Sequence, residues 1–280
     1  MTSKNVTKAE TTELAVSDLP DFMKGMAGTG SEGISNEDVG LPRISMLQAL
    51  SPQVATGEGK PGDFYHLLAE KNLGNKLRFI PIIVSRSYML WRPRETGGGL
   101  LARADDGIHW SPKNAQFQVT LKSGQSVVWE TKETVAGSGL DKWGSSNPAD
   151  PTSLPAATKM HNVLAYLVDY PELGPTVITL QRSSLKPGKR FLGKLKTSQA
   201  PSFGLVFEMS SEAIQGPKGL YQSPVFTGKG FNGDAKLFAE LKDMYDHFRV
   251  AGVKVSDKDL QSEGVDDDAG EKSDTGRDDF

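Results

Sequence analysis

The stretch LRFIPIIVSRSYMLWR, residues 77–92, decides the fold that we predict for this chain. β-branched and aromatic residues dominate it, and such residues fit the pleated, half-buried surface of a β-strand. Its length predicts one long strand. Pro81 cannot donate a hydrogen bond to a neighbouring strand, so it predicts a bend or bulge at that point.

The distal half of this strand has two different faces, because successive side chains of a strand alternate. One face carries Arg86, Tyr88, Leu90 and Arg92, and the other, which has the character of a core, carries Ser85, Ser87, Met89 and Trp91. Cations that follow a phosphate backbone, next to a ring that stacks on a base, are typical of a groove for a single nucleic-acid strand. We therefore assign Arg86, Tyr88 and Arg92 to such a groove; the alternative is a solvated strand face.

The rest of the chain predicts more strands than helices. Further strands are expected in two pairs, at 116–121 with 126–130 and at 161–170 with 176–180, and two more are expected at 203–209 and 219–226. Apolar residues at helical spacing predict one clear helix, which Gly252 ends; they are Leu237, Phe238, Leu241, Met244, Tyr245 and Phe248. The fold class is therefore mainly β with a few helices, which a small β-barrel with long loops would fit. That this barrel is OB-fold-like is an analogy to the fold most often used to bind single strands.

Charge divides the chain into three parts. Residues 1–40 contain seven acidic and three basic residues, and residues 256–280 contain ten acidic and three basic residues. Because the whole chain has a net charge of −3, residues 41–255 carry +8 between ends of −4 and −7. We expect residues 41–255 to be a folded, nucleic-acid-binding body, and the two polar, acidic ends to be disordered.

The densest positive segment is 182–196, in which six of fifteen residues are basic and none is acidic. Its apolar residues can pack a short helix onto the sheet while the basic ones face outward. Solvated helix faces usually mix both signs of charge, so the absence of acid favours contact with phosphate. The residues assigned to this contact are Arg182, Lys186, Lys189, Arg190, Lys194 and Lys196.

A long loop at 137–155, rich in Gly, Ser and Pro, contains Lys142 and Trp143. A large aromatic side chain beside a lysine in such a loop is a candidate for stacking on a base. We add both residues to the predicted nucleic-acid site.

The last residues, Asp278-Asp279-Phe280, place an aromatic ring and the terminal carboxylate at the end of an acidic arm. The ring can fill an apolar pocket of a partner while the carboxylates meet Lys or Arg around it. This tail resembles the C-terminal tails of single-stranded-DNA-binding proteins, those of bacteria and especially those of T7-like phages. The resemblance covers the tail only, and the Ile-Pro-Phe ending of the bacterial proteins is absent.

Several other classes of protein have little support. Cysteine is absent, and the four histidines His66, His109, His161 and His247 have no spacing typical of metal ligands, so we predict no metal and no cofactor. Gly228, Gly230 and Gly233 spell G-x-G-x-x-G, but no returning strand follows them as a dinucleotide-binding unit needs. No run of residues has the length of a membrane span and no signal peptide is evident, so we expect a soluble protein of the cytoplasm, the host's if the chain is phage-encoded.

The resemblance implies a non-enzymatic protein that coats single-stranded DNA in replication, recombination or repair. Its tail would compete for the DNA groove and recruit replication proteins such as a polymerase or helicase-primase. The alternatives are a metal-dependent nuclease or other DNA-processing enzyme, and a virion or structural protein with an acidic tail. The sequence leaves open whether the chain forms a homo-oligomer.

Overall fold

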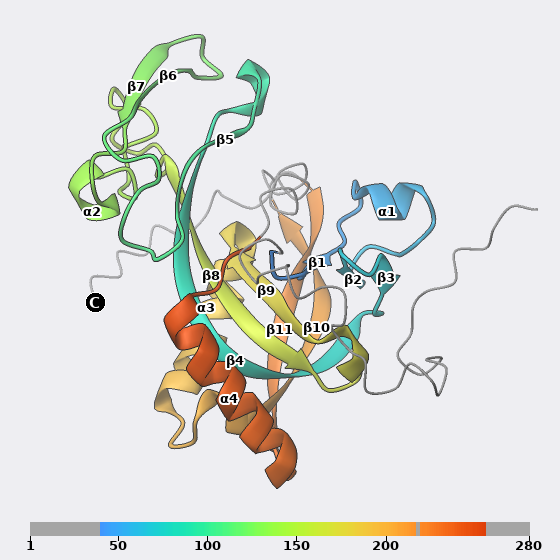
Figure 1. Ribbon diagram of the computed structural model, residues 1–280. Helices are drawn as coiled ribbons and strands as arrows, with labels where there is room; N and C mark the ends of the chain where they lie inside the picture. Colours follow the sequence, from blue (N-terminus) through green and yellow to red (C-terminus); the bar gives the residue numbers. More distant parts are fainter. Residues whose placement is uncertain (1–39, 217–218, 256–280) are drawn as a thin grey trace, which may run out of the picture. The chain divides into compact units, whose positions relative to one another are not determined.

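The computed structural model describes residues 40–216 and 219–255 (Figure 1). The strands are β1 (Arg43–Met46), β2 (Phe64–His66), β3 (Lys71–Asn72), β4 (Lys76–Trp91), β5 (Leu100–Ala104), β6 (Gln116–Thr120), β7 (Ser126–Glu130), β8 (Ala157–Leu167), β9 (Pro175–Gln181), β10 (Leu205–Gly216) and β11 (Gly219–Phe231). The α-helices are α1 (Pro52–Ala55), α2 (Val135–Ser138), α3 (Leu185–Thr197) and α4 (Ala235–Ala251). Short 3-10 helices are η3 (Arg94–Thr96), η4 (Pro171–Leu173), η5 (Arg182–Ser184) and η6 (Ser202–Gly204).

Strand β4 is the centre of a curled sheet that, within the described residues, has nine strands. The order is β11-β10-β4-β8-β9-β1-β2-β3, and β5 pairs with the far end of β4. Figure 1 shows β4 as one long, curved strand that runs along the sheet to β5. Its pairing with β8 shifts register between Pro81 and Ile83, which confirms the predicted long strand with an irregularity at the proline. The mainly β, barrel-like fold is also confirmed, with more strands than the five of an OB-fold.

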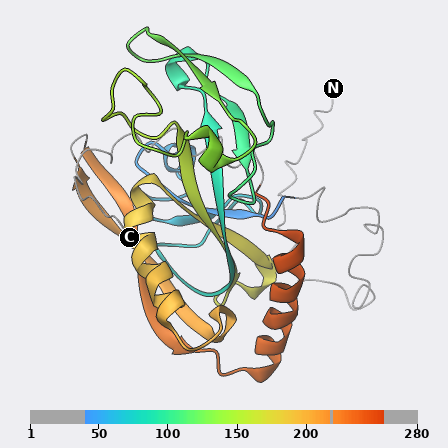
Figure 2. The same ribbon diagram turned by 90° about the vertical axis from the view of Figure 1, so that its left-hand side faces the viewer.

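The sheet is covered on both faces. Leu241 of α4 packs with Ile80 and Ile82 of β4 on one face, whereas Phe191 of α3 packs with Phe79 on the other. Figure 2 shows α3 and α4 on opposite sides of the strands. Both helices were predicted from their apolar spacing. As predicted, Gly252 ends α4, which begins at Asp234, whose carboxylate accepts hydrogen bonds from two backbone amides.

Four phenylalanines form the centre of the core beneath α3. The ring of Phe191 lies 4.8 Å from that of Phe226 and 4.9 Å from that of Phe207, measured between centroids. The ring of Phe79 lies within 6.2 Å of all three. Offset and edge-on contacts of this kind stabilise the fold beyond the area that they bury.

A third hydrophobic cluster lies at the far end of β4. The hairpin of β6 and β7, predicted from its sequence, contributes Trp129, which packs with Trp110 and with Leu90 of β4. On the α3 side of the sheet this cluster and the phenylalanine core therefore occupy opposite ends of β4.

A chain of polar side chains crosses four neighbouring strands inside the sheet. Arg43, which is fully buried, donates from Nε to Thr179 Oγ1 at 3.1 Å, and Thr179 Oγ1 donates to Asn162 Oδ1 at 3.1 Å. Asn162 Nδ2 then donates to Ser87 Oγ at 3.0 Å. A slip of one residue would move each of these side chains to the other face, so the chain favours a single register of β1, β9, β8 and β4.

The curl of the sheet is fastened by the side chain of Gln48, which follows β1. Its Nε2 donates to the backbone oxygen of Gln222 at 3.1 Å, and its Oε1 accepts from the Gln222 amide at 2.8 Å. Gln222 lies in β11, the strand at the opposite end of the sheet order. The edge strand β11 is therefore joined to the segment after β1 through one side-chain amide.

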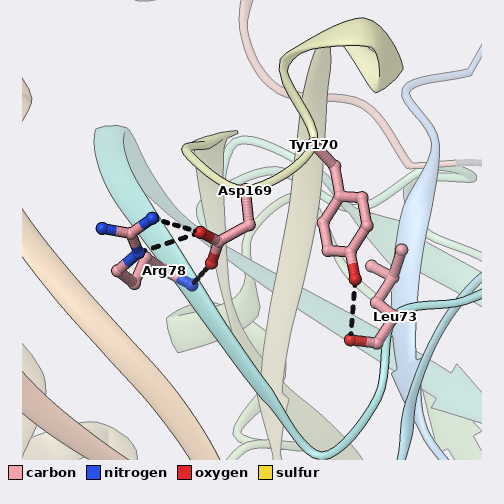
Figure 3. Close-up of polar contacts among 4 residues, drawn as sticks. All are labelled: Leu73, Arg78, Asp169 and Tyr170. Carbon is pink, nitrogen blue, oxygen red and sulfur yellow. Dashed lines mark hydrogen bonds and ion pairs between the residues drawn. The ribbon is translucent and has the colours of Figure 1, made fainter.

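The turn after β8 is tied to the start of β4 (Figure 3). Asp169 accepts hydrogen bonds from the backbone amide of Arg78 at 2.7 Å and from its Nε at 2.9 Å. The hydroxyl of the next residue, Tyr170, donates to the backbone oxygen of Leu73 at 3.2 Å. These bonds fix the first residues of β4, at the end of the strand that lies away from the β6–β7 hairpin.

One detail of the sequence interpretation is wrong. Gly228 and Gly230, expected in a turn, lie inside β11, and β10 and β11 both extend beyond their predicted bounds. Pairing with β10 compensates the low strand preference of glycine here. The predicted disordered segments, 1–40 and 256–280, lie outside the described residues except for residue 40.

We predict that Phe191→Ala lowers the free energy of unfolding by about 3–5 kcal/mol, because it opens a cavity among three other aromatic rings. Urea denaturation measures this change. Phe231→Ala is the matched control, since that ring is 75% exposed and its removal leaves no cavity. Equal effects of the two substitutions would show that the phenylalanine core does not hold α3 to the sheet.

Candidate nucleic-acid interface

Neighbouring positions of β4 and β8 place three basic side chains on the α3 face of the sheet. Arg86 is paired with His161, and Tyr88 is paired with Lys159. Residues that oppose each other in an antiparallel pair project from the same face, and so do residues two apart along a strand. Arg86, Lys159 and His161 therefore lie side by side.

Helix α3 brings a fourth basic residue to this place. A Cβ atom on Gly188 would lie 2.9 Å from Cδ1 of Leu180, so a larger residue would have to displace the Leu180 side chain for the helix to lie this close to β9. Leu180 is the residue of β9 paired with His161. Lys189 follows Gly188, and its charge acts on both Lys159 and His161. We call Arg86, Lys159, His161 and Lys189 the cation cluster.

The cation cluster lies in a gap between two hydrophobic clusters. Along β8, Ala157 belongs to the cluster of the β6–β7 hairpin and Val163 belongs to the phenylalanine core. The residues between them on the same face are Lys159 and His161. Along β4, Arg86 has the equivalent position between Tyr88 and Val84. The basic residues thus occupy the part of this face that neither cluster covers.

The cations of this cluster repel one another. Partial burial, followed by the charges of Arg86 and Lys189, holds the pKa of Lys159 below its usual value. Partial burial and the charges of Lys159, Arg86 and Lys189 likewise lower the pKa of His161. Within residues 40–216 and 219–255, none of the four cluster residues forms an ion pair. Asp141 acts in the opposite direction on Lys159, without a direct ion pair.

The structure corrects the predicted role of Tyr88 as an open stacking platform. Its side chain is 6% exposed and packs in the hairpin cluster with Leu90, so this strand face is a core at its far end. The guanidinium carbon of Arg86 lies 5.9 Å from the centre of the Tyr88 ring, close enough for a cation–π contact. Burial raises the pKa of the Tyr88 hydroxyl.

The other basic residues of the acid-free segment lie on α3 or directly before it. Lys186, Arg190, Lys194 and Lys196 are exposed on α3, whereas Gly188 and Phe191 are buried. Lys194 Nζ donates to the backbone oxygen of Phe226 at 3.4 Å. Arg182 differs from this group, because it is half-buried in η5, with a left-handed backbone φ of 47°.

The predicted residues outside α3 are divided by the fold. Lys142 is exposed, and Trp143 is 65% exposed. Both directly follow Asp141, whose negative charge acts on Lys159. Arg92 is exposed beyond the end of β4, six residues from Arg86, which is about 20 Å along a strand. Arg92 is therefore not part of the cation cluster. Asp278, Asp279 and Phe280 lie outside the described residues.

Two members of the cluster, Lys159 and His161, were not predicted as site residues. His161 was interpreted as an ordinary histidine, and Lys159 lies just before the predicted start of its strand. Alternation along residues 157–167 puts both on one face, but only the register of β8 against β4 shows that this face meets Arg86.

Acid–base groups elsewhere serve structural roles. Asp106 Oδ1 accepts from the backbone amides of Ile108 and His109, and its Oδ2 lies 2.7 Å from His109 Nδ1. Asp105 forms an ion pair with Arg103. In the part of the chain that the structure describes, no three His, Asp or Glu side chains are grouped to hold a metal ion. No helix among the same residues is long and apolar enough to cross a membrane.

We predict that His161 titrates below pH 6.5 and that Lys189→Gln moves its midpoint upward, because one repelling charge is removed. The ring signals of the histidines, followed by NMR over pH, measure this. His66 is the internal control, since its pKa is lowered mainly by burial in β2 and should not respond to Lys189. An unmoved His161 midpoint would show that Lys189 lies too far away to act on the cluster.

Comparison with known protein families gives a match over most of the chain. The model of the family described as Pam3 phage gp34-like protein matches residues 9–254, which include all of the strands, helices and basic residues described above. No curated protein and no solved structure matches the chain significantly. The match extends over most of the chain, and the chain belongs to the Pam3 phage gp34-like protein family.

Proposed function

We propose that this phage-family protein binds single-stranded DNA through its sugar–phosphate backbone and coats it without sequence specificity during replication or recombination. The observation that carries the proposal is the cation cluster, in which four basic side chains from three elements converge and no described acid pairs with them. A phage protein with this role would act in the cytoplasm of the host cell.

An anion is the natural complement of the cluster. Partial burial, and after it the charges of the neighbouring cluster residues, lower the pKa values of Lys159 and His161, so the cluster opposes their protonation. A phosphate between these side chains would relieve that repulsion and release bound counterions, which is the main source of backbone affinity. The exposed cations of α3 would extend the track to further phosphates.

Exposed Trp143 favours a single strand over a duplex. An aromatic ring can stack on any base whose face is open, so stacking adds affinity without reading sequence. In a duplex the base faces are already covered by their neighbours. Lys142 beside it would contact the adjoining phosphate.

The acidic residues 256–280 complete the proposal. A segment of net charge −7 on the same chain as a body of charge +8 has a high effective concentration at the cations. It would therefore compete with DNA, and DNA binding would free it. The resemblance of its Asp278-Asp279-Phe280 end to known tails suggests that the freed segment recruits a polymerase or helicase-primase.

The first test is the salt dependence of binding to an oligonucleotide. We expect the triple change Lys159→Gln, Lys189→Gln and Arg190→Gln to reduce the slope of log affinity against log salt by up to about 0.7 for each phosphate that the variant no longer neutralises. Fluorescence anisotropy at several salt concentrations measures the slope.

The matched control removes three positive charges from α4, on the opposite face of the sheet, by Lys236→Gln, Lys242→Gln and Arg249→Gln. Net charge is then equal in the two variants, and the location differs. The control also breaks two exposed ion pairs, Lys236 with Glu240 and Lys242 with Asp246. Equal slopes for both would contradict a phosphate track along α3 and the cation cluster.

The second test concerns the tail. Truncation after Val255, which keeps this buried residue, should raise single-strand affinity, most strongly at low salt where charges are least screened. Phe280→Ala removes no charge, so it should leave DNA affinity unchanged while weakening capture of the replication partner. A truncated chain that binds DNA no more tightly at low salt would mean that the tail does not compete.

A further inference from the structure

A cavity of about 100 Å³ opens on the α3 side of the sheet, between β1, β9 and η5. Met209 of β10 and Pro224 of β11 complete its wall from the opposite end of the sheet order. It exists because Gln48, itself a lining residue, draws β11 toward β1. None of the functions argued so far uses this cavity.

The lining of the cavity is apolar on one part and hydrogen-bonding on another. Its apolar part includes Ile44, Phe64 and Met209, and no lining residue is charged. Gln53 and Ser183 supply an amide and a hydroxyl. Among the residues that the structure describes, neither of these two side chains has a hydrogen-bond partner. Such a lining suits a flat, uncharged group with donors and acceptors on its edge.

The size of the cavity limits this group to about one ring. An apolar cavity of about 150 Å³ holds a benzene molecule, so a space of about 100 Å³ that is partly open to solvent suits a single six-membered ring better than a fused pair. A pyrimidine base has this size, this flatness and this edge chemistry.

The cavity adjoins the cation cluster. Leu180 lines the cavity, and it is also the residue of β9 that is paired with His161. Gly188, which packs on Leu180, precedes Lys189 of the cluster. The cavity and the cluster therefore lie on the two sides of β9, and adjacent strands are about 4.8 Å apart.

We infer that the cavity is a pyrimidine subsite, which takes the base of a nucleotide whose backbone lies on the cation cluster. This inference rests on the proposed binding of single strands and adds a preference to it. Backbone contacts give affinity for every strand, while the cavity favours strands that can insert a thymine or cytosine. Gln53 and Ser183 would bond the edge of the base, and Phe64 and Met209 would contact its ring.

The test compares three oligonucleotides of about 16 nucleotides, which are oligo(dT), oligo(dA) and a strand of abasic sites. The unmodified chain should bind oligo(dT) about tenfold more tightly than oligo(dA), the scale of two hydrogen bonds to a base. The abasic strand should bind more weakly still, because it also offers no base to stack on Trp143. The double change Gln53→Ala and Ser183→Ala should remove this preference while leaving the affinity for the abasic strand and its salt slope unchanged.

The control changes Gln118→Ala and Ser126→Ala, an exposed pair of the same residue types on the β6–β7 hairpin. Gln53→Trp, which fills the cavity from α1, should have the same effect as the double change and is independent of η5. Equal affinity of the unmodified chain for oligo(dT) and oligo(dA), or a preference that survives both cavity variants, would overturn the subsite alone. Absence of binding to any strand at low salt would overturn the proposed function and the subsite with it.

Discussion

Two hydrophobic clusters cover the two ends of one face of β4 and β8. Charged side chains can lie on this face only in the gap between the clusters. The phenylalanine core beneath α3 covers one end of this face, and the cluster of the β6–β7 hairpin covers the other. Between them Arg86, Lys159 and His161 remain open to solvent or half-buried. A basic residue placed further along either strand would be buried without a partner, at a cost of several kcal/mol.

The position of α3 depends on the same arrangement. Phe191 anchors the helix in the core, and Gly188 lets its first turns lie close to β9. Lys189 then reaches the gap while Arg190 faces solvent. Two small structural requirements, a ring and a missing side chain, thus bring a helix cation to the strand cations. The packing of the two hydrophobic clusters holds these cations close together despite their mutual repulsion.

Local signals in the sequence predicted most of the fold. The apolar run of β4, the β6–β7 hairpin and the spacing of α4 are recognisable because each involves residues close together in the chain. The site was predicted less well, because its residues meet only through pairing over long separations. The pairing of Arg86 with His161 joins positions 75 apart, and the alternation of β4 does not reveal that a distant hairpin covers Tyr88. The cations of α3 were found because an acid-free segment is visible without knowledge of the fold.

The contact between Gln48 and β11 has a consequence for self-association. The edge strand of an open sheet carries unpaired amides and carbonyls that can recruit a strand from another copy of the chain, which leads to aggregation. Gln48 occupies both the amide and the carbonyl of Gln222 with one side chain, as a neighbouring strand would. Such pairing is most favoured at high local concentration, which is the condition that the proposed coating of DNA would create. Near the start of β11, the amide therefore leaves one residue fewer that can pair with a strand of another copy.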